Sequence, residues 1–263
     1  MKILALTCCC VDVFPDTGGI IPGGNALNLA VGCKTVSKTD VYLMGCIGKD
    51  LYGEKIKEAI DAHDINREKL YEVEGESASN RIFLTSEGER YFKTDSWNGG
   101  VYETFILSSE DRAYIHTMDA VATTYYDPNF LTLLEERRKG QFMMAVDFHD
   151  EALQLAWEEY LPNIDLFFIS GKEEQFEQFK RWSAQYETLF VATLGAKGSI
   201  AFKNGECYIT EAVPVKEVVD TTGCGDAYQG AFIASYIVKK DIPKAMEAGS
   251  IAAAKTLSHM GGV

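Results

Sequence analysis

Short apolar runs alternate with amphipathic segments of helical length over most of the chain. In the first part, residues 3–11 and 41–47 predict buried strands, and residues 25–37 and 51–61 predict helices. Apolar strands that alternate with amphipathic helices are typical of a mostly parallel sheet covered on both faces, so we expect a three-layer α/β/α sandwich. From residue 113 the alternation is regular, with predicted strands at 113–117, 142–148, 166–170, 189–194, 199–203 and 207–210 and predicted helices at 129–138, 151–161, 173–186, 226–239 and 243–258.

Residues 70–95 follow a different pattern, in which apolar residues stand among many polar ones on both sides of a turn at residues 86–89. Such a pattern is typical of a β-hairpin that packs one face and exposes the other to water. We therefore expect a single domain over residues 1–263, with a small β lid formed mainly by residues 12–22 and 71–95. A bare edge strand in that lid would favour a homodimer through the lid.

The composition narrows the class of protein. The 263 residues are 46% hydrophobic and 24% charged, a globular balance that excludes a disordered, collagenous or coiled-coil chain. The formal charge of −14 disfavours nucleic acid and anionic membranes as partners, because such a chain repels phosphate groups at long range. A small phosphorylated ligand can still bind through local donors. No window offers the ~20 apolar residues of a membrane-spanning helix.

The cysteines indicate a reducing compartment. There are seven of them, with Cys8, Cys9 and Cys10 in a row and no Cys-x-x-Cys pair, so a zinc site is not expected. Free thiols of this kind favour a cytoplasmic protein. The apolar stretch after Lys2 is too short for a signal peptide, and Asp12 interrupts its continuation.

The segment 218–227 carries the clearest chemistry, because Gly223-Cys224-Gly225-Asp226 stands between a predicted strand and a predicted helix. A tight Gly-x-Gly turn leaves the first N–H groups of the helix free, and the helix dipole adds partial positive charge, so the turn can hold an anion. Asp226, which we expect to begin the helix, can accept a proton from an alcohol while the turn holds charge on a transferring phosphoryl group. Alternatively, Asp226 only caps the helix.

Residues 220–226, Asp-Thr-Thr-Gly-Cys-Gly-Asp, resemble the C-terminal signature of the ribokinase-like, or PfkB, carbohydrate kinases, with Cys224 in place of the usual alanine. Residues 23–28, Gly-Gly-Asn-Ala-Leu-Asn, resemble the N-terminal signature of that family, and residues 45–53 and 193–198 resemble two of its glycine turns. The resemblance spans nearly the whole chain and implies an α/β sandwich with a small β lid. Neither a dinucleotide-binding glycine motif nor a P-loop occurs.

The resemblance implies an ATP-dependent sugar kinase that uses Mg²⁺, with K⁺ as a further candidate ion. Asp226 would be the base, and the backbone N–H groups of Gly223, Cys224 and Gly225 would stabilise the developing charge. The other implied roles are sugar binding by Asp12, Gly23, Gly24, Asn25 and Asn28, nucleotide binding by Thr193, Gly195 and Gly198, water-mediated support of Mg²⁺ by Glu174, and binding of the monovalent cation by Asp220.

Within the family, residues 10–15 and 23–31 most resemble kinases that act on fructoselysine. The implied acceptor is a primary hydroxyl, C6 of fructoselysine or of a related fructosamine or ketose. Arg81, Arg90 and Asp95 of the lid are candidates for contact with its amino-acid part. Fructose, ribose, ketogluconate, a nucleoside and pyridoxal are alternative acceptors, and a sugar-binding regulator without catalysis is a further alternative.

Several residues leave these assignments open. Thr7-Cys8 stands where the family often has Gly-Asp, and residues 171–174 lack the asparagine of the usual Asn-x-x-Glu motif. The polar residues of the N-terminal signature could instead cap a helix or a strand end. His116 and Asp147 end predicted strands on the side where ligands bind such sheets. Trp97, at the lid, could pack on a ligand or only close the hairpin.

Overall fold

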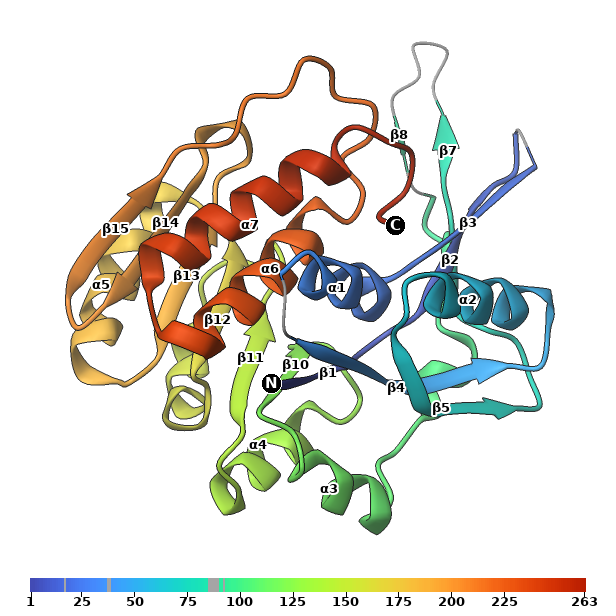
Figure 1. The fold of residues 1–263 in the computed structure, drawn as a ribbon, viewed down its shortest axis with the longest axis horizontal. Coiled ribbons are helices and arrows are strands. Elements are labelled where there is room, and N and C mark those ends of the chain that lie inside the picture. The colour runs from blue at the N-terminus through green and yellow to red at the C-terminus, as the bar shows by residue number, and fades with distance from the viewer. Residues whose placement is uncertain (17, 37–38, 85–89, 92) are drawn as a thin grey trace.

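A nine-stranded sheet forms the centre of the computed structural model, which describes residues 1–16, 18–36, 39–84, 90–91 and 93–263. Its strands are β1 (Lys2–Leu6), β4 (Asp40–Gly48), β5 (Asn66–Val73), β10 (Ala120–Thr124), β11 (Met143–Asp147), β12 (Leu166–Ser170), β13 (Leu189–Thr193), β14 (Ser199–Lys203) and β15 (Glu206–Thr210). They follow the order β15-β14-β13-β12-β11-β10-β1-β4-β5 (Figure 1). The strands from β13 to β5 are parallel, and β14 and β15 extend the sheet as an antiparallel hairpin.

Helices cover both faces of this sheet. One face packs against α1 (Asn25–Lys34), α2 (Leu51–Ala62), α6 (Cys224–Lys239) and α7 (Ile242–Thr256), and the other against α3 (Ser109–Ile115), α4 (Phe130–Lys139) and α5 (Phe176–Gln185) (Figure 1). Successive side chains of β1 alternate between the two faces of the sheet. Ile3 and Ala5 pack into the core under α1, α2, α6 and α7, whereas Leu4 and Leu6 pack into the core under α3, α4 and α5. The predicted three-layer α/β/α sandwich is confirmed.

A small four-stranded sheet, with the order β3-β2-β6-β9, stands beside the main one. It consists of β2 (Cys10–Phe14), β3 (Gly19–Gly23), β6 (Ser79–Arg81) and β9 (Trp97–Asn98). A separate hairpin joins β7 (Phe83–Leu84) to β8 (Arg90–Tyr91), and the turn predicted at 86–89 lies outside the described residues. The first residues of the lid segment predicted at 71–95 belong instead to β5, because Tyr71 pairs with Cys46 in the main sheet.

The first predicted strand was wrong in its extent. The apolar run at residues 3–11 contains β1, which ends at Leu6, and the start of β2, which begins at Cys10 and belongs to the small sheet. Both strands bury their side chains almost completely, so the hydrophobic pattern carries no sign of the point where the chain leaves the main sheet.

Two further predictions of secondary structure were wrong. Residues 113–117 lie in and just after α3 rather than in a strand. That helix begins with a capping box, in which Ser108 and Asp111 each accept a hydrogen bond from the backbone N–H of the other. Residues 151–161 form no α-helix but contain the 3₁₀ turns η2 (Leu155–Glu159) and η3 (Leu161–Asn163), the second of which begins just before a proline.

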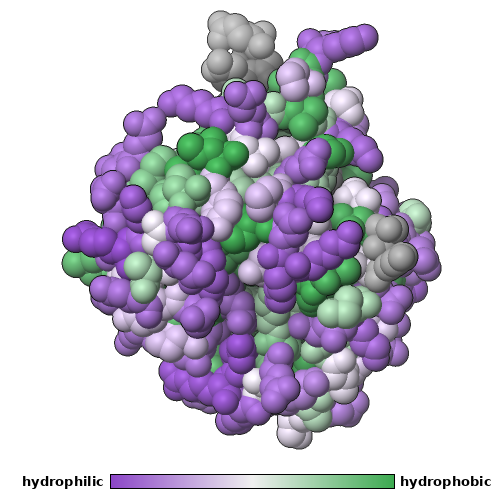
Figure 2. All heavy atoms as spheres, turned by 60° about the vertical axis from the view of Figure 1, so that its left-hand side comes forward, coloured by the Kyte–Doolittle hydropathy of each residue, from purple (hydrophilic) through white to green (hydrophobic). Residues whose placement is uncertain are grey.

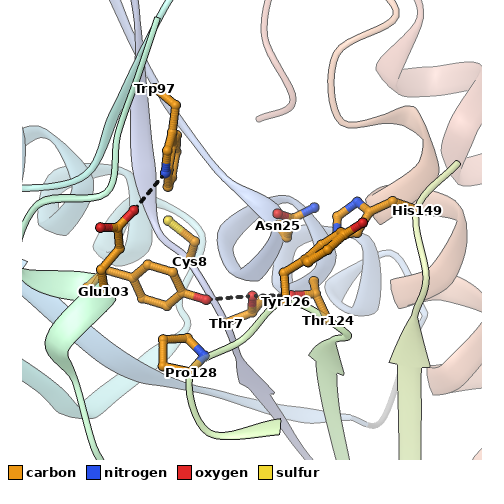
Figure 3. A pocket seen from close by; sticks show the side chains of 10 residues that line it. Thr7, Cys8, Asn25, Trp97, Glu103, Thr124, Tyr126, Pro128 and His149 are labelled. Carbon is orange, nitrogen blue, oxygen red and sulfur yellow. Dashed lines mark hydrogen bonds between the residues drawn. The ribbon is translucent and has the colours of Figure 1, made fainter. Parts of the chain in front are cut away.

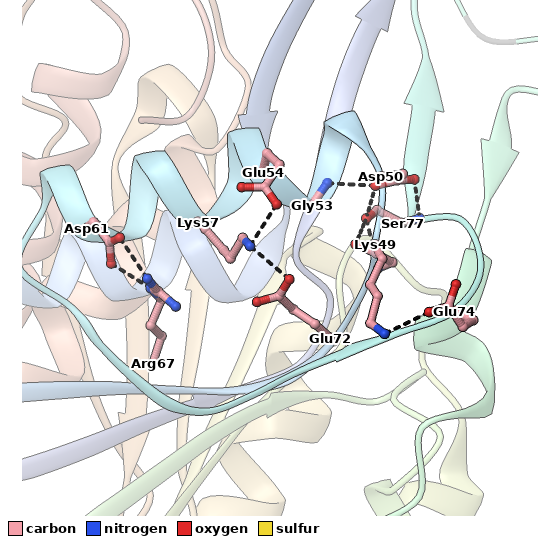
Figure 4. Close-up of polar contacts among 11 residues, drawn as sticks. Lys49, Asp50, Gly53, Glu54, Lys57, Asp61, Arg67, Glu72, Glu74 and Ser77 are labelled. Carbon is pink, nitrogen blue, oxygen red and sulfur yellow. Dashed lines mark hydrogen bonds and ion pairs between the residues drawn. The ribbon is translucent and has the colours of Figure 1, made fainter.

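The turn before α2 explains the pattern of residues 45–53. Asp50 caps α2, and its carboxylate accepts the N–H of Gly53 at 2.7 Å and the N–H and hydroxyl of Ser77 at 2.8 and 2.7 Å (Figure 4). Burial raises the pKa of Asp50, but these hydrogen bonds outweigh burial and hold the pKa below its ordinary value. The motif therefore ties α2 to the segment that leads into the small sheet.

Hydrophilic side chains cover most of the face that Figure 2 shows, and hydrophobic residues are visible there in small separate areas. This surface agrees with the charge of −14 and with the large share of apolar side chains buried in the two cores. Across the described residues, no helix combines the length and the apolar character needed to span a bilayer.

Candidate active site

Polar side chains gather at the carboxyl end of the parallel strands. Thr124, Asp147, Ser170 and Thr193 are the last residues of β10, β11, β12 and β13, and Thr7 follows directly after β1. Because neighbouring parallel strands end at the same edge of a sheet, these residues lie side by side along that edge. Ligands of open α/β sheets bind at this edge, and two cavities lie there.

The β11–β13 cavity, above the ends of those three strands, has a volume of about 280 Å³. Three carboxylates face it, from Asp147, Asp150 and Asp226, and none of the described residues that line it is a lysine or an arginine. An anionic ligand here must therefore be held by backbone donors, by a histidine or by a cation that it brings with it. The complete lining is Asn25, Asp147, His149, Asp150, Ser170, Thr193, Gly223, Gly225, Asp226 and Gln229.

The β1–β10 cavity, above the ends of those two strands, has a volume of about 350 Å³. Trp97 and Glu103 lie on one side of it, across from Tyr126 and His149 (Figure 3). Its lining is Thr7, Cys8, Asn25, Trp97, Tyr102, Glu103, Thr124, Tyr126, Pro128 and His149. Since Asn25 and His149 line both cavities, the two cavities meet at these residues.

Asp226 lies beside this junction. Its Oδ1 accepts a hydrogen bond from Asn25 Nδ2 at 2.9 Å, and its Oδ2 accepts one from Asn28 Nδ2 at 3.0 Å. The side chain is partly exposed on the cavity side, yet the protein around it is dense enough that burial raises the pKa of Asp226 to about 6, against the lowering effect of both amides. A carboxylate with this pKa is ionised at neutral pH and can still take up a proton, as a general base must.

The chain turns sharply just before α6. Gly223 has a φ of 72°, in the left-handed region, and a Cβ on it would lie 2.6 Å from the Cα of Gly262, so this position needs glycine. The helix α6 begins at Cys224, two residues before the predicted start, so Asp226 lies within its first turn. The strand predicted to precede the turn is absent, since residues 211–223, all of them described, form no strand.

This turn presents backbone donors to the β11–β13 cavity. The N–H of Cys224 points back to the carbonyl oxygen of Thr221 at 3.4 Å, and the N–H of Ala227 donates to Gly223 at 2.8 Å. Between them, the N–H groups of Gly225 and Asp226 form no hydrogen bond to the described residues that precede α6. Free N–H groups at the start of a helix bind anions, so this turn can hold a phosphoryl oxygen.

Close helix packing joins the two halves of the site, because α1 carries both asparagines and α6 carries the aspartate. A Cβ on Gly32 of α1 would lie 2.6 Å from the carbonyl oxygen of Ala227. A Cβ on Gly230 of α6 would collide with the carbonyl oxygen of Leu29. These two glycines let the helix backbones approach closely enough for the amide-to-carboxylate hydrogen bonds to form.

The residues predicted to bind sugar gather next to Asn25. Around Gly23, a Cβ would lie 3.8 Å from Asp12 Oδ2 and 3.6 Å from Asn28 Oδ1, so these two buried side chains face one spot. Asn28 Oδ1 is buried and has no hydrogen-bond partner within the described part of the chain. Gly24 holds the N-cap position of α1 with a φ of 90°, so Asn25 is not the cap. Their contact with a sugar stays a prediction.

The residues predicted to bind nucleotide and Mg²⁺ are more scattered. Thr193 lines the β11–β13 cavity, whereas Gly195 and Gly198 lie in the turn after β13 and line neither cavity. A Cβ on Gly198 would collide with the carbonyl oxygen of Thr210, so packing alone requires glycine there. Glu174 is exposed on η4 (Glu173–Gln175) and also lines neither cavity.

Asp220 is buried and connects two segments of the chain. Its Oδ1 accepts the N–H of Thr222 at 2.9 Å, and its Oδ2 accepts the N–H of Gly261 at 2.7 Å. Asp220 therefore lies beside Gly261, where the monovalent cation was predicted. In the part of the chain that the structure describes, no group of three or more His, Cys, Asp or Glu side chains is arranged to hold a metal ion.

The acceptor contacts predicted for the lid residues stay a prediction, whereas the position predicted for one histidine differs from the structure. Arg81 forms an ion pair with Asp95 at 2.9 Å, and both residues lie outside the two cavities. Of Arg90, only the backbone, in β8, is described. The placement of His116 at the ligand side was wrong, because its ring contacts Glu136 at 2.8 Å before β10 begins, at the amino end of the sheet. Asp147 does line a cavity at the carboxyl end.

Sequence reasoning did not single out six residues of the β1–β10 cavity, namely Tyr102, Glu103, Thr124, Tyr126, Pro128 and His149. His149 follows the end of β11 closely with a φ of 55°, and its N–H donates to Asp147 Oδ1 at 2.9 Å. A polar residue just after a buried strand was a usable signal for His149. Glu103 lies in η1 (Gly100–Thr104), and nothing in its local pattern separates it from an ordinary surface glutamate.

A base and an anion-binding turn that face one junction suit the transfer of a phosphoryl group to an alcohol, which is the chemistry of a phosphotransferase. The family model of the pfkB carbohydrate kinases matches residues 15–263, and the chain belongs to this family. It is thus a phosphotransferase that acts on a sugar hydroxyl. The sequence-based prediction of the family is confirmed.

Several relatives match almost the whole chain. A fructoselysine 6-kinase of Shigella flexneri is 29% identical over 258 residues, covering 96% of this chain and 95% of the relative. A fructosamine kinase of Bacillus subtilis is 26% identical over 269 residues, covering 99% and 92%. Among solved structures, ribokinase of Arabidopsis thaliana complexed with ribose and ATP has a TM-score of 0.84 at 20% identity, covering 99% of this chain and 93% of that one.

Proposed function

We propose that this protein is an ATP-dependent kinase that phosphorylates the C6 hydroxyl of fructoselysine or of a related fructosamine. One observation carries the proposal: Asp226 lies where two cavities meet, and the free N–H groups of its own helix turn face one of them. The acceptor would occupy the β1–β10 cavity and the terminal phosphate of ATP the β11–β13 cavity. The fructoselysine and fructosamine kinases among the relatives support the acceptor class, and the ribokinase complex with ATP supports the nucleotide.

In the proposed reaction, Asp226 takes the proton of the acceptor hydroxyl as that oxygen attacks the γ-phosphorus. The bond from phosphorus to the bridging oxygen breaks, and ADP leaves. The N–H groups of Gly225 and Asp226 would hold the transferring phosphoryl oxygens, while Asn25 and Asn28 hold the carboxylate in place. The small sheet would cover the acceptor and exclude water, since Trp97 of β9 lines the β1–β10 cavity.

The composition of the β11–β13 cavity fits a nucleotide that arrives with Mg²⁺. Its described lining offers carboxylates and no lysine or arginine, so a bare triphosphate would be repelled. Mg²⁺ keeps several waters and binds through one or two carboxylates together with the phosphates. Asp147 and Asp150, which line this cavity, would hold it in this way. When bound, the ion neutralises phosphate charge. Glu174 would act through water from outside the cavity.

The test measures ADP release with Mg-ATP against fructoselysine, a second fructosamine, fructose, ribose, ketogluconate, adenosine and pyridoxal. We expect fructosamines to give the highest kcat/KM. Turnover that is higher on another acceptor would contradict the substrate while leaving the chemistry of Asp226 intact. Asp226→Asn serves as the control for contaminating kinases, because its loss of basicity should abolish nearly all turnover in the same preparation.

A further inference from the structure

The two cavities share an unusual charge pattern. Within the described lining, His149 is the only residue able to carry positive charge, whereas negative charge stands at Asp147, Asp150 and Asp226 in one cavity and at Glu103 in the other. The carboxylates of the β11–β13 cavity fit a metal-bound nucleotide. Glu103 lines the β1–β10 cavity, which the phosphates of the nucleotide would not enter. Its negative charge therefore needs an explanation other than binding of a metal-bound nucleotide.

Glu103 is built into the wall of the β1–β10 cavity. Its Oε1 accepts the indole N–H of Trp97 at 3.0 Å, and the two side chains stand together on one side of the cavity (Figure 3). The side chain of Glu103 also lies where a Cβ of residue 99 would be, so Gly99 leaves it room. Across the described residues, no lysine or arginine forms an ion pair with this carboxylate, and no hydrogen bond to its Oε2 is found.

Trp97 supplies the second element of a cation site. It is 46% exposed and lines the β1–β10 cavity, so part of its indole is accessible to a ligand there. An indole face attracts a cation through its quadrupole and also packs on an aliphatic stem. A carboxylate next to an exposed indole is therefore suited to an alkylammonium group.

The position of this pair within the cavity gives the substrate its direction. Asn25 and His149, where the reaction would take place, lie across the cavity from Trp97 and Glu103 (Figure 3). In a ketose, C6 and C1 are at opposite ends of the molecule. An acceptor whose C6 hydroxyl reaches Asp226 thus directs the group on C1 toward Glu103.

We propose that Glu103 and Trp97 form a subsite for an ammonium group attached to C1 of the acceptor, and that this subsite selects amine adducts of ketoses over neutral and anionic sugars. The inference rests on the proposed function for the direction of the substrate. It assigns recognition of the substituent to Glu103 and Trp97, in place of Arg81, Arg90 and Asp95. An acidic sugar such as ketogluconate would place a carboxylate against that of Glu103 and be rejected.

The experiment compares Glu103→Gln with the wild type on fructoselysine, 1-amino-1-deoxyfructose and fructose. Glutamine keeps a side-chain oxygen that can accept the hydrogen bond of the indole N–H, and it removes only the charge. We expect KM for both cationic acceptors to rise roughly tenfold or more, with kcat within about twofold and with kcat/KM for fructose unchanged. Glu58→Gln is the matched control, because Glu58 is exposed on α2 and lines neither cavity.

Equal losses on fructose and on the cationic acceptors, or no loss on any of them, would overturn the subsite. Calorimetric titration of fructoselysine into Asp226→Asn, with and without Glu103→Gln, measures binding without turnover. If fructoselysine binds in a manner that depends on Glu103 but is not phosphorylated by the wild type, the subsite stands and the proposed reaction fails. If turnover is high and the affinity for fructoselysine is the same with and without Glu103→Gln, the proposed reaction stands and the subsite is wrong.

Discussion

Asn25 and Asp226 are 201 residues apart in the sequence, and their side chains are joined by a hydrogen bond of 2.9 Å. Asn28 reaches the other carboxylate oxygen from the same helix at 3.0 Å. The two family signatures thus meet at a single carboxylate group, which the amides orient toward the junction of the cavities. This contact also opposes the effect of burial on the pKa of Asp226, so it affects both the geometry and the protonation of the proposed base.

Asp226→Asn should lower kcat by about 10²–10⁴-fold, since it removes a general base and keeps the shape of the side chain. Because the folded pKa of Asp226 is raised to about 6, ionisation above that pH costs folding free energy that the neutral amide does not. The variant should therefore be more stable than the wild type at pH 7–8, with the difference vanishing near pH 4. Thermal unfolding across this pH range measures the effect, and a variant less stable at pH 8 would contradict it.

The pH profile of kcat/KM should fall on the acid side with a midpoint near pH 6, because only ionised Asp226 accepts a proton. The hydrogen bond from Asn25 lowers this pKa, so Asn25→Ala should move the midpoint to higher pH in addition to lowering the rate. A variant that loses rate at an unchanged midpoint would show that Asn25 acts only on the substrate.

Gly230→Ala should separate α6 from α1, because the added Cβ collides with the backbone of Leu29. We expect a loss of about 1–3 kcal/mol in the free energy of unfolding and a fall in kcat. Gly249→Ala, on α7, is the matched control, since the atoms nearest to its Cβ, at 2.8 Å, belong to the ring of Tyr228 on α6 rather than to α1. Urea unfolding measures the stability of both variants, and initial rates measure their kcat. An equal loss of kcat in both variants would contradict the role of the α1–α6 contact.

Asp50→Ala should lower the free energy of unfolding by about 2 kcal/mol, because it removes the cap of α2 and the carboxylate that accepts the N–H and the hydroxyl of Ser77. The pKa of Asp50 is held below its ordinary value, so this stabilisation is present at neutral pH and is lost as the pH falls through that lowered pKa. Asp61→Ala, which breaks a surface ion pair with Arg67 (Figure 4), should cost under about 1 kcal/mol. Similar Tm values for both variants would contradict the prediction.

Local signals were enough for much of the fold. The alternation of apolar strands and amphipathic helices predicted the sandwich, and the helices near 129–138, 226–239 and 243–258 match α4, α6 and α7 closely. The strand predicted at residues 113–117 was wrong, although the sequence held a signal against it. Ser108 and Asp111 form a capping box, which starts a helix. The break after Leu6 had no local signal, since both neighbouring strands are buried.

The sequence by itself determined the family and the glycine turn before Asp226, because these depend on residues that are adjacent in the chain. Only the tertiary structure decided what surrounds that aspartate: two amides from α1, a partly exposed indole from the small sheet, and Glu103 beside it. These groups come from separate elements, and their spacing depends on how closely helices and sheets pack. Local sequence constrains the backbone of each element, whereas the distance between two elements follows from the whole core.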